Sequence, residues 1–258
     1  MVLRRRRMST HPPPLPAEPS PAFDREAAHY RRNWDSRPIV QIWRGRVLSA
    51  VLEGVGDRLR VLDIGAGSGA DSAALRAAGC ETLAIEPSAG MRAVALERGV
   101  VALAGGLEQA AELAGPDYDV VLLNFGVLNC VARIDELGAT LARVLRVGGR
   151  VVLVWMSRHC PVESVERLAR GQRLRRGRAT AIVAGQEIPV SWWSVAAVEA
   201  ALGSAFRVRR VEALGLLVPA PDLGGRPGWR SEWDPWLSRW PILREWGDHT
   251  LLVAERVS

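Results

Sequence analysis

A glycine-rich loop with acidic residues near it is the part of the sequence best suited to bind a ligand. The loop reads Asp63-Ile64-Gly65-Ala66-Gly67-Ser68-Gly69, and another acid, Glu86, closes the next apolar run. Glycines let the backbone approach a ligand closely and take conformations that a side chain would forbid. The spacing Gly65-x-Gly67-x-Gly69 differs from the dinucleotide pattern, which has two residues before its third glycine. The loop predicts a nucleotide-type ligand without naming it.

Two acids narrow the choice of ligand. Glu86 can accept hydrogen bonds from both hydroxyls of a ribose. Asp63, before the loop, would repel a pyrophosphate and attract a sulfonium or ammonium group. These charges favour a cationic amino-acid nucleoside over NAD, with a structural cap on the following turn as the alternative role of Asp63.

Residues that could contact a second substrate follow the fourth and fifth predicted strands. They are Asn129 and Cys130 after the fourth, and Met156, Arg158 and His159 after the fifth. A histidine has a pKa suited to proton removal near neutrality, so His159, and His29 on a leading helix, are the candidate bases. Structural roles remain the alternatives: a buried or packing histidine, a small apolar filler at Cys130, and a turn or cap at Asn129.

Tryptophans are concentrated in two late segments. Trp192 and Trp193 sit beside a predicted hairpin and are candidate substrate contacts. Five more, Trp229, Trp233, Trp236, Trp240 and Trp246, lie in the last connection. They either anchor an irregular loop that lacks other core or form a lid over a flat, apolar acceptor.

Apolar runs alternate with helical stretches through the middle of the chain. The predicted strands are 60–64, 82–85, 100–104, 120–124 and 150–155, and the helices between them are 70–78, 89–97, 107–113 and 134–145. Continuous apolar strands that alternate with helices indicate a parallel sheet covered on both faces. The Val147-Gly148-Gly149 turn is expected to end the last of these helices.

The flanking segments complete one expected domain. Residues 1–22, basic and then proline-rich, are expected to be a disordered tail. Residues 23–56 form a helical cap broken near Ser36-Arg37-Pro38, and 57–157 the core. Residues 158–205 form an insertion with a hairpin (178–183 and 186–190) and a helix from Ser194, and 206–258 two final strands, 206–218 and 249–256.

Composition excludes several partners. No apolar run approaches the roughly 20 residues of a membrane-spanning helix, and no hydrophobic stretch follows the basic start, so we expect a cytoplasmic protein without a membrane partner. The formal charge is +6, but residues 4–7 supply four of the arginines, and Met8 is an alternative start. The near-neutral remainder does not predict nucleic-acid binding. Cys80, Cys130 and Cys160 have no metal-ligand spacing, so no metal is expected.

The motifs together resemble those of class I S-adenosylmethionine-dependent methyltransferases. They are the stretches 61–69, 86–88 (Glu86-Pro87-Ser88), 119–126 and 145–149, in the family's order and spacing. The resemblance implies a Rossmann-like three-layer sandwich with a seven-stranded, mostly parallel sheet whose last strand is antiparallel. It also implies S-adenosylmethionine as cofactor and S-adenosylhomocysteine as product.

The resemblance also implies roles for single residues. The loop residues Gly65, Ala66, Gly67 and Gly69 would contact the methionine end of the cofactor, together with Asp63. Glu86 and Pro87 would face the ribose, Gly106 and Leu107 the adenine, and Asn124, Phe125 and Gly126 the methionine moiety and the methyl group. Tyr30 resembles a tyrosine that closes the pocket. Many relatives carry an aspartate near Gly106 to bind the adenine amine; this chain has none there, so backbone groups or Glu108 would bind it. After Tyr30 relatives often have an aspartate, where this chain has Arg31.

The favoured function is methyl transfer to oxygen, nitrogen or carbon of a small-molecule acceptor. A non-catalytic S-adenosylmethionine-binding module and an NAD(P)-dependent oxidoreductase are the alternatives. The chain lacks the Asn-Pro-Pro-aromatic type of motif of nucleic-acid enzymes after its fourth strand. The sequence leaves open the acceptor, the methylated atom, the use of a base, and whether the protein is a monomer or a homodimer.

Overall fold

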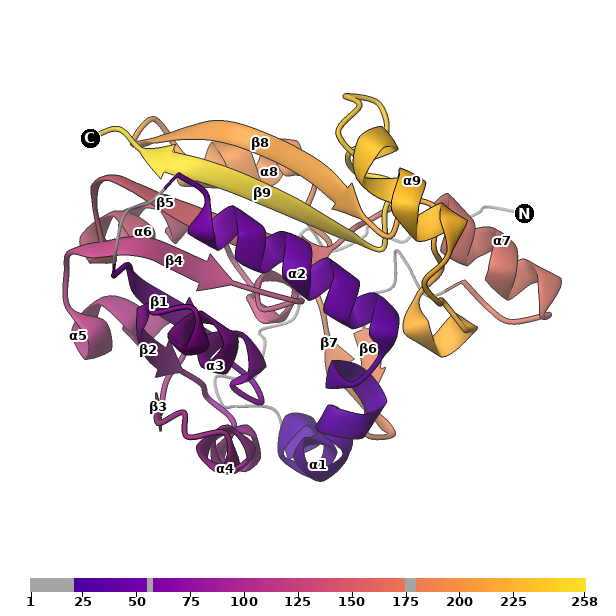
Figure 1. The fold of residues 1–258 in the computed structure, drawn as a ribbon, viewed down its shortest axis with the longest axis horizontal. Helices are drawn as coiled ribbons and strands as arrows, with labels where there is room; N and C mark the ends of the chain where they lie inside the picture. The colour runs from indigo at the N-terminus through magenta and orange to yellow at the C-terminus, as the bar shows by residue number, and fades with distance from the viewer. Residues whose placement is uncertain (1–20, 55–57, 175–179) are drawn as a thin grey trace, which may run out of the picture.

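The computed structural model describes residues 21–54, 58–174 and 180–258. The expected tail, apart from its last two residues, and the first two residues of the expected hairpin lie outside these ranges. Within the described residues, seven strands form one sheet in the order β3-β2-β1-β4-β5-β9-β8 (Figure 1). Its strands are β1 Arg60–Ile64, β2 Glu81–Ile85, β3 Ala102–Leu103, β4 Tyr118–Leu123, β5 Leu145–Met156, β8 Phe206–Leu214 and β9 His249–Arg256.

The pairing confirms the expected three-layer, mostly parallel architecture. Strands β1 to β5 pair in parallel, whereas β9 runs antiparallel to both β5 and β8. The register sets Ile64 of β1 beside Ile85 of β2, so the two strands end together. The glycine loop and Glu86 therefore leave the same edge of the sheet.

Helices cover both faces of the sheet. The face carrying Val61 and Leu122 packs against α2 and α3, and the face carrying Leu62 and Leu123 packs against α5, α6 and α8 (Figure 1). In the described part of the chain, no helix is both long and apolar enough to cross a membrane. The α-helices are α1 Pro21–Tyr30, α2 Pro38–Leu52, α3 Ala70–Ala77, α4 Ala89–Glu97, α5 Ala110–Ala114, α6 Leu137–Val144, α7 Pro161–Ala169, α8 Val195–Leu202 and α9 Trp229–Leu237.

Of the sheet strands, β1 and β9 have their predicted bounds, whereas the other five differ, β3 and β5 in instructive ways. Strand β3, at one edge of the sheet, has only two residues and pairs with β2 alone. Strand β5 begins at Leu145, directly after α6, so the prediction that Val147-Gly148-Gly149 ends the helix is wrong. Gly148, at φ +76°, lies inside the strand, where the register with β4 shifts between Tyr118 and Val120. The glycines therefore form an irregularity in a strand.

The N-terminal helices and the hairpin pack against each other. A π-helical turn, Arg31–Asp35, separates α1 from α2, which confirms the predicted break. The hairpin strands are β6 Thr180–Val183 and β7 Gln186–Pro189. Ala22 and Phe23 of α1 join Ile188, Met156 and Trp192 in one apolar cluster. Helix α1 and the hairpin thus form a continuous cover near the carboxyl end of β5.

The contact between α6 and α8 depends on Gly138, which has no side chain. A Cβ at Gly138 would stand 2.2 Å from the backbone oxygen of Leu202, whereas one at Gly45, exposed in α2, would meet nothing within 4 Å. We predict that Gly138→Ala lowers the free energy of unfolding by about 2 kcal/mol or more, because backbone must move. Gly45→Ala should raise it by about 0.5–1 kcal/mol. Urea unfolding of both variants checks this, and equal effects would contradict it.

Candidate functional site

The three loop glycines serve different purposes. All have positive φ, of +72° at Gly65, +54° at Gly67 and +71° at Gly69. A Cβ at Gly65 would stand 2.5 Å from Val127 Cγ2, and one at Gly69 would stand 2.9 Å from Ala95 Cβ. A Cβ at Gly67 would have no neighbour within 4 Å. Gly65 and Gly69 thus pack the loop onto the protein, and Gly67 leaves open space for a ligand.

Glu86 is buried and holds the loop from the next strand. Its Oε2 accepts a hydrogen bond from Gly67 N at 2.8 Å, and its Oε1 accepts one from Ser88 N at 2.8 Å. Burial raises the pKa of Glu86, against these two bonds, which lower it. Each carboxylate oxygen has a second lone pair that ribose hydroxyls could use.

Asp63 is also buried, and its charge is poorly compensated. Its Oδ2 accepts a hydrogen bond from Ser72 Oγ at 2.6 Å. Burial, and then the nearby charge of Asp71, raise the pKa of Asp63 from its ordinary 3.8 to about 7. A cationic group in the site would favour the ionised form of this carboxylate.

A buried network that the sequence analysis missed supports the site. Arg44 Nε donates to Asp71 Oδ1 at 2.7 Å, and Arg44 Nη2 donates to Asp35 Oδ1 at 3.0 Å. Asp71 Oδ2 accepts from Asn124 Nδ2 at 2.9 Å, and Asp35 Oδ2 accepts from Ser68 Oγ at 2.6 Å. The network therefore joins α2, the glycine loop and the end of β4.

One signal in the sequence indicated this network. Val40, Arg44, Val47 and Val51 occupy one stripe of α2, and all four are buried. An arginine in an apolar stripe requires a buried partner. The partner is Asp71, 27 residues further on, and no local sequence pattern identifies it.

The predicted residues Asn124 and Phe125 lie beside this network. The Asn124 amide donates to Asp71 Oδ2 and accepts from Phe125 N at 2.9 Å, which leaves one N–H and one lone pair. Phe125 has φ +44°, a strained value for a bulky residue. Its ring contacts the His249 ring, with centroids 5.4 Å apart, and lies 5.6 Å from the Arg44 guanidinium carbon. Gly126 follows with φ +96°.

The charge of Glu86 acts on both Tyr30 and Cys130. Burial raises the pKa of Tyr30 well above its usual value, and the Asp35, Asp71 and Glu86 charges raise it further. The Cys130 side chain is exposed to solvent, yet the surrounding protein raises the pKa of its thiol to about 11, with Glu86 contributing. Tyr30 and Cys130 therefore both lie near Glu86.

Helix α1 is held over the site by a second contact missed from the sequence. Asp24 Oδ1 accepts from Ser88 Oγ at 2.6 Å and from Gly90 N at 2.9 Å. These bonds lower the pKa of Asp24. A Cβ at Gly90 would stand 2.9 Å from Asp24 O, so α1 and α4 are in close contact.

The segment predicted to contact adenine, around Gly106 and Leu107, makes its hydrogen bond within the protein. Gly106 N donates to Gln109 Oε1 at 2.9 Å, and Leu107 is buried. Pro87 O and Glu86 O both accept from Arg92 Nη1, so backbone groups beside Pro87 are already bonded. Contact of these residues with adenine and ribose stays a prediction.

Among the predicted substrate residues, two support the fold. Asn129 is fully buried, and its amide bonds to Met156 N at 2.8 Å and to Ser191 O at 2.8 Å. Trp193 Nε1 donates to Leu128 O at 2.8 Å. Both residues position the loop after β4, which favours the structural alternative over substrate contact. Met156 and Trp192 are half-buried in the cluster that α1 shares with the hairpin.

The candidate bases are on the surface. His159 and Arg158 are exposed after β5, and His29 is exposed on α1, where its Nδ1 lies 3.2 Å from Arg32 Nη2. A base role for either histidine stays a prediction. The sequence analysis overlooked His249, which begins β9 and is buried against the rings of Trp34, Trp43 and Phe125.

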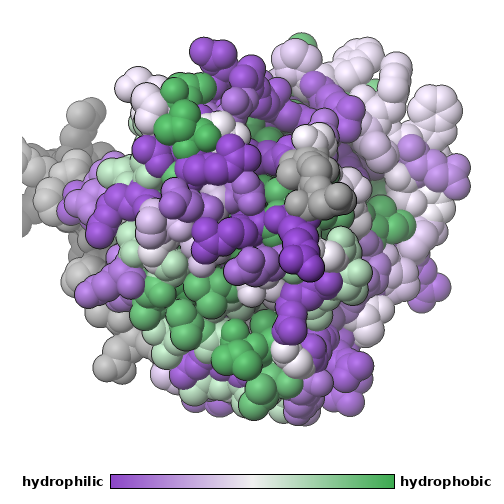
Figure 2. All heavy atoms as spheres, turned by 60° about the vertical axis from the view of Figure 1, so that its left-hand side comes forward, coloured by the Kyte–Doolittle hydropathy of each residue, from purple (hydrophilic) through white to green (hydrophobic). Residues whose placement is uncertain are grey.

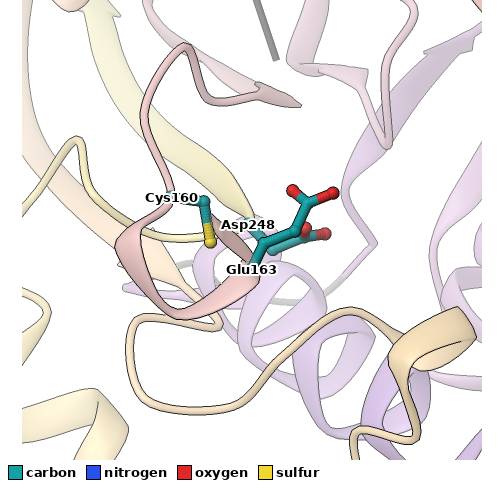
Figure 3. Close-up of side chains that lie close together, drawn as sticks. All are labelled: Cys160, Glu163 and Asp248. Carbon is teal, nitrogen blue, oxygen red and sulfur yellow. The ribbon is translucent and has the colours of Figure 1, made fainter. Parts of the chain in front are cut away.

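Cys160, Glu163 and Asp248 form a buried cluster in which the possible ligand atoms lie within 4.8 Å of one another (Figure 3). Glu163 Oε1 also accepts from Arg167 Nε at 2.6 Å, and Arg167 Nη2 donates to Asp222 at 2.7 Å. Asp248 Oδ2 lies 2.8 Å from His249 Nδ1. These bonds explain the cluster as a polar junction of α7 with the start of β9, and we assign no ion to it.

A hollow of about 670 Å³ lies at the opposite edge of the sheet. Figure 2 turns this edge toward the viewer, and its upper part is mainly hydrophilic. Its arginines are largely paired with its acids, as in Arg146–Asp119, Arg209–Glu255 and Arg210–Glu53. The hollow is separated from the glycine loop by the length of β1, so it is not part of the candidate site.

Comparisons with known proteins agree with this fold and site. Residues 62–153 match the family described as methyltransferase domain. The chain is 36% identical over 135 residues to a demethylmenaquinone methyltransferase of Thermobifida fusca, an alignment covering 49% of this chain and 54% of that protein. It is 35% identical over 151 residues to one of Clavibacter sepedonicus, covering 54% and 58%. The chain thus spans about half the length of these curated relatives.

Solved structures resemble the whole fold. A methyltransferase of Thermotoga maritima, described as a possible histamine N-methyltransferase, has a TM-score of 0.60 at 18% identity, covering 91% of this chain and 97% of that one. The N-methyltransferase NodS of Bradyrhizobium japonicum, solved with S-adenosylhomocysteine, has a TM-score of 0.56 at 14% identity, covering 92% and 96%. The fold is thus of the Rossmann-like class. Residues 62–153 match a methyltransferase domain, and the whole fold is similar to that of a protein described as an S-adenosylmethionine-dependent methyltransferase.

The raised pKa of Asp63 predicts a pH dependence of stability. Between about pH 4 and pH 7 the folded protein holds a proton on Asp63 that the unfolded chain has released, so stability falls as pH rises through this window. Asp63→Asn should remove about 2 kcal/mol of that fall between pH 5 and pH 7. Urea unfolding of the apoprotein at both pH values measures it.

Asp119→Asn is the control for this experiment. Hydrogen bonds from Arg60 N and Arg146 outweigh burial and lower the pKa of Asp119, so this substitution should cost stability mainly above the unfolded pKa. Identical pH slopes in wild type and Asp63→Asn would contradict the assignment.

Proposed function

We propose that this protein transfers a methyl group from S-adenosylmethionine to a small, largely apolar acceptor. The observation that carries the proposal is the pair of buried carboxylates, Asp63 and Glu86, at the ends of β1 and β2 beside an open Gly67. A dinucleotide would place a pyrophosphate near Asp63, where the charges repel. An adenosine cofactor with a cationic amino-acid end would instead place a positive charge near Asp63, where the two attract.

The residues present fit this cofactor. Glu86 would bind the ribose hydroxyls through its remaining lone pairs, and Asp63 would attract the positive end. The open backbone at Gly67 would allow close approach. S-adenosylmethionine, when bound, supplies an electrophilic methyl group on a positively charged sulfur.

The protein's contribution to the reaction would be alignment and exclusion of water. Tyr30, on α1, and the hairpin would cover the edge, because α1 is tied to α4 through Asp24 and to the hairpin through the Phe23–Ile188 cluster. A general base is required only if the acceptor arrives protonated. His159 remains the candidate base after β5, and His29 the second.

The acceptor side supports an apolar substrate. Met156 and Trp192 offer apolar surface, and Cys130, with its thiol pKa at about 11, stays protonated at neutral pH. A protonated thiol is a poor nucleophile and base. The names of the curated relatives, demethylmenaquinone methyltransferases, suggest a quinone-type ring as one acceptor class to test.

The cofactor assignment can be tested with substitutions at the two ends of β2. Glu86→Gln, at the end of β2, should weaken binding of S-adenosylmethionine by about tenfold or more, because a charged hydrogen-bond acceptor is lost. Glu81→Gln, exposed at the start of β2, is the matched control and should bind as wild type. Asp63→Ala should abolish binding. Calorimetry with S-adenosylmethionine and with NAD(P) measures these affinities. Wild-type affinity in Asp63→Ala, or tighter binding of NAD(P), would overturn the assignment.

Catalysis needs a separate experiment. Purified protein incubated with S-adenosylmethionine and a panel of hydroxylated aromatics, quinols and amines should release S-adenosylhomocysteine with at least one of them, detected by mass spectrometry. Binding of the cofactor without turnover across the panel would favour the non-catalytic module instead.

A further inference from the structure

Helix α9 exposes tryptophans along one face. Trp229, Trp233, Trp236 and Trp240 follow one another at spacings of four, three and four residues, which places them on the same side of a helix. Their exposed fractions are 67%, 56%, 59% and 51%. The rings of Trp233, Trp236 and Trp240 contact edge to face, with centroids 6.1 and 5.4 Å apart. We call these four residues the tryptophan stripe.

The opposite face of α9 is polar and buried. Asp234 accepts from Arg46 Nη1 at 2.9 Å and from Leu217 N at 2.8 Å. Ser238, fully buried just after the helix, accepts from Arg46 Nη2 at 2.9 Å. Ser231 is buried as well. Surface helices normally bury their apolar side, so α9 has the reverse arrangement.

The polar contacts keep α9 in this orientation. Arg46 also lies 3.3 Å from Glu212, whose other oxygen accepts from Arg239 Nε at 2.8 Å. Rolling the helix to bury the tryptophans would leave Asp234 and Arg46 without these partners, at a large cost. Of the two roles left open for these tryptophans, anchoring a loop does not fit, because they face solvent, and a lid over the acceptor stays a prediction.

The charges around the stripe favour a negative surface. In the described segment 222–246, three arginines, Arg226, Arg230 and Arg244, and two acids, Glu232 and Glu245, have no ion-pair partner. Arg230 lies over the Trp229 ring, at 5.6 Å from its centroid. The unpaired arginines beside the stripe thus outnumber the unpaired acids by one, and Arg230 lies directly against its first ring.

The stripe lies on the side of the sheet where the candidate site is. Strand β8 ends at Leu214, which pairs with His249, and His249 pairs with Met156 at the end of β5. Figure 1 shows α9 beyond the ends of β8 and β9. A surface bound by the stripe would therefore be near the predicted acceptor side.

We propose that the tryptophan stripe docks this protein on a membrane surface containing anionic lipids. Indole rings favour the membrane–water interface, since they are apolar and carry one polar N–H. A helix with an aromatic face and basic residues lies in the plane of that interface. Such docking needs no spanning helix, but it would contradict the expectation that the protein has no membrane partner. Docking does not depend on the proposed methyl transfer.

Vesicle sedimentation of the full chain tests the proposal. Wild type should bind vesicles of phosphatidylcholine mixed with phosphatidylglycerol, and more weakly those of phosphatidylcholine alone. The variant Trp233→Ser/Trp236→Ser/Trp240→Ser should lose about tenfold or more of the bound fraction. Leu96→Ser/Val101→Ser removes two exposed apolar side chains elsewhere and should bind as wild type. Unchanged thermal unfolding of the variants checks that they fold.

Three outcomes would overturn the proposal. Wild type that binds neither vesicle excludes membrane docking. A tryptophan variant that binds as well as wild type assigns binding to another part of the chain, such as the basic start. A dimer in size-exclusion chromatography that the same three substitutions dissociate would assign the stripe to a second copy of the chain. Quenching of indole fluorescence by brominated lipid provides the direct readout of insertion.

Discussion

Four carboxylates are buried together at the carboxyl edge of the sheet, and the surrounding structure must offset their negative charge. They belong to Asp35, Asp63, Asp71 and Glu86. Arg44 neutralises part of it from α2, and backbone amides and serine hydroxyls bond much of the rest. Asp63 is the least compensated, which its raised pKa records. A site with surplus negative charge and an open glycine is suited to a positively charged cofactor.

The cover over this edge depends on contacts between distant segments. Asp24 ties α1 to the start of α4, and the Phe23–Ile188 cluster ties α1 to the hairpin. Asn129 joins the loop after β4 to the end of β5 and to Ser191. Because each contact links different elements, the surroundings of Tyr30 and Cys130 are a product of the assembled fold.

Helix α9 shows how a buried polar network can decide what is exposed. Arg46 holds Asp234 and Ser238 inward, so the apolar ring surfaces face outward. Such an arrangement costs folding free energy unless another surface covers the rings. The helix combines two constraints, anchoring to β8 through polar groups and presenting an aromatic ridge.

The sequence by itself determined the elements and the cofactor loop, because both depend on residues a few positions apart. Periodicity predicted β1 and β9 with their observed bounds, and Ser194 caps α8 through Ala197 N. Only the tertiary structure decided which acids meet Arg44, that Asn129 is a support, and that the tryptophans face outward. These depend on contacts such as Arg46–Asp234, 188 residues apart, and no local pattern of hydrophobicity encodes which distant polar group a side chain will meet.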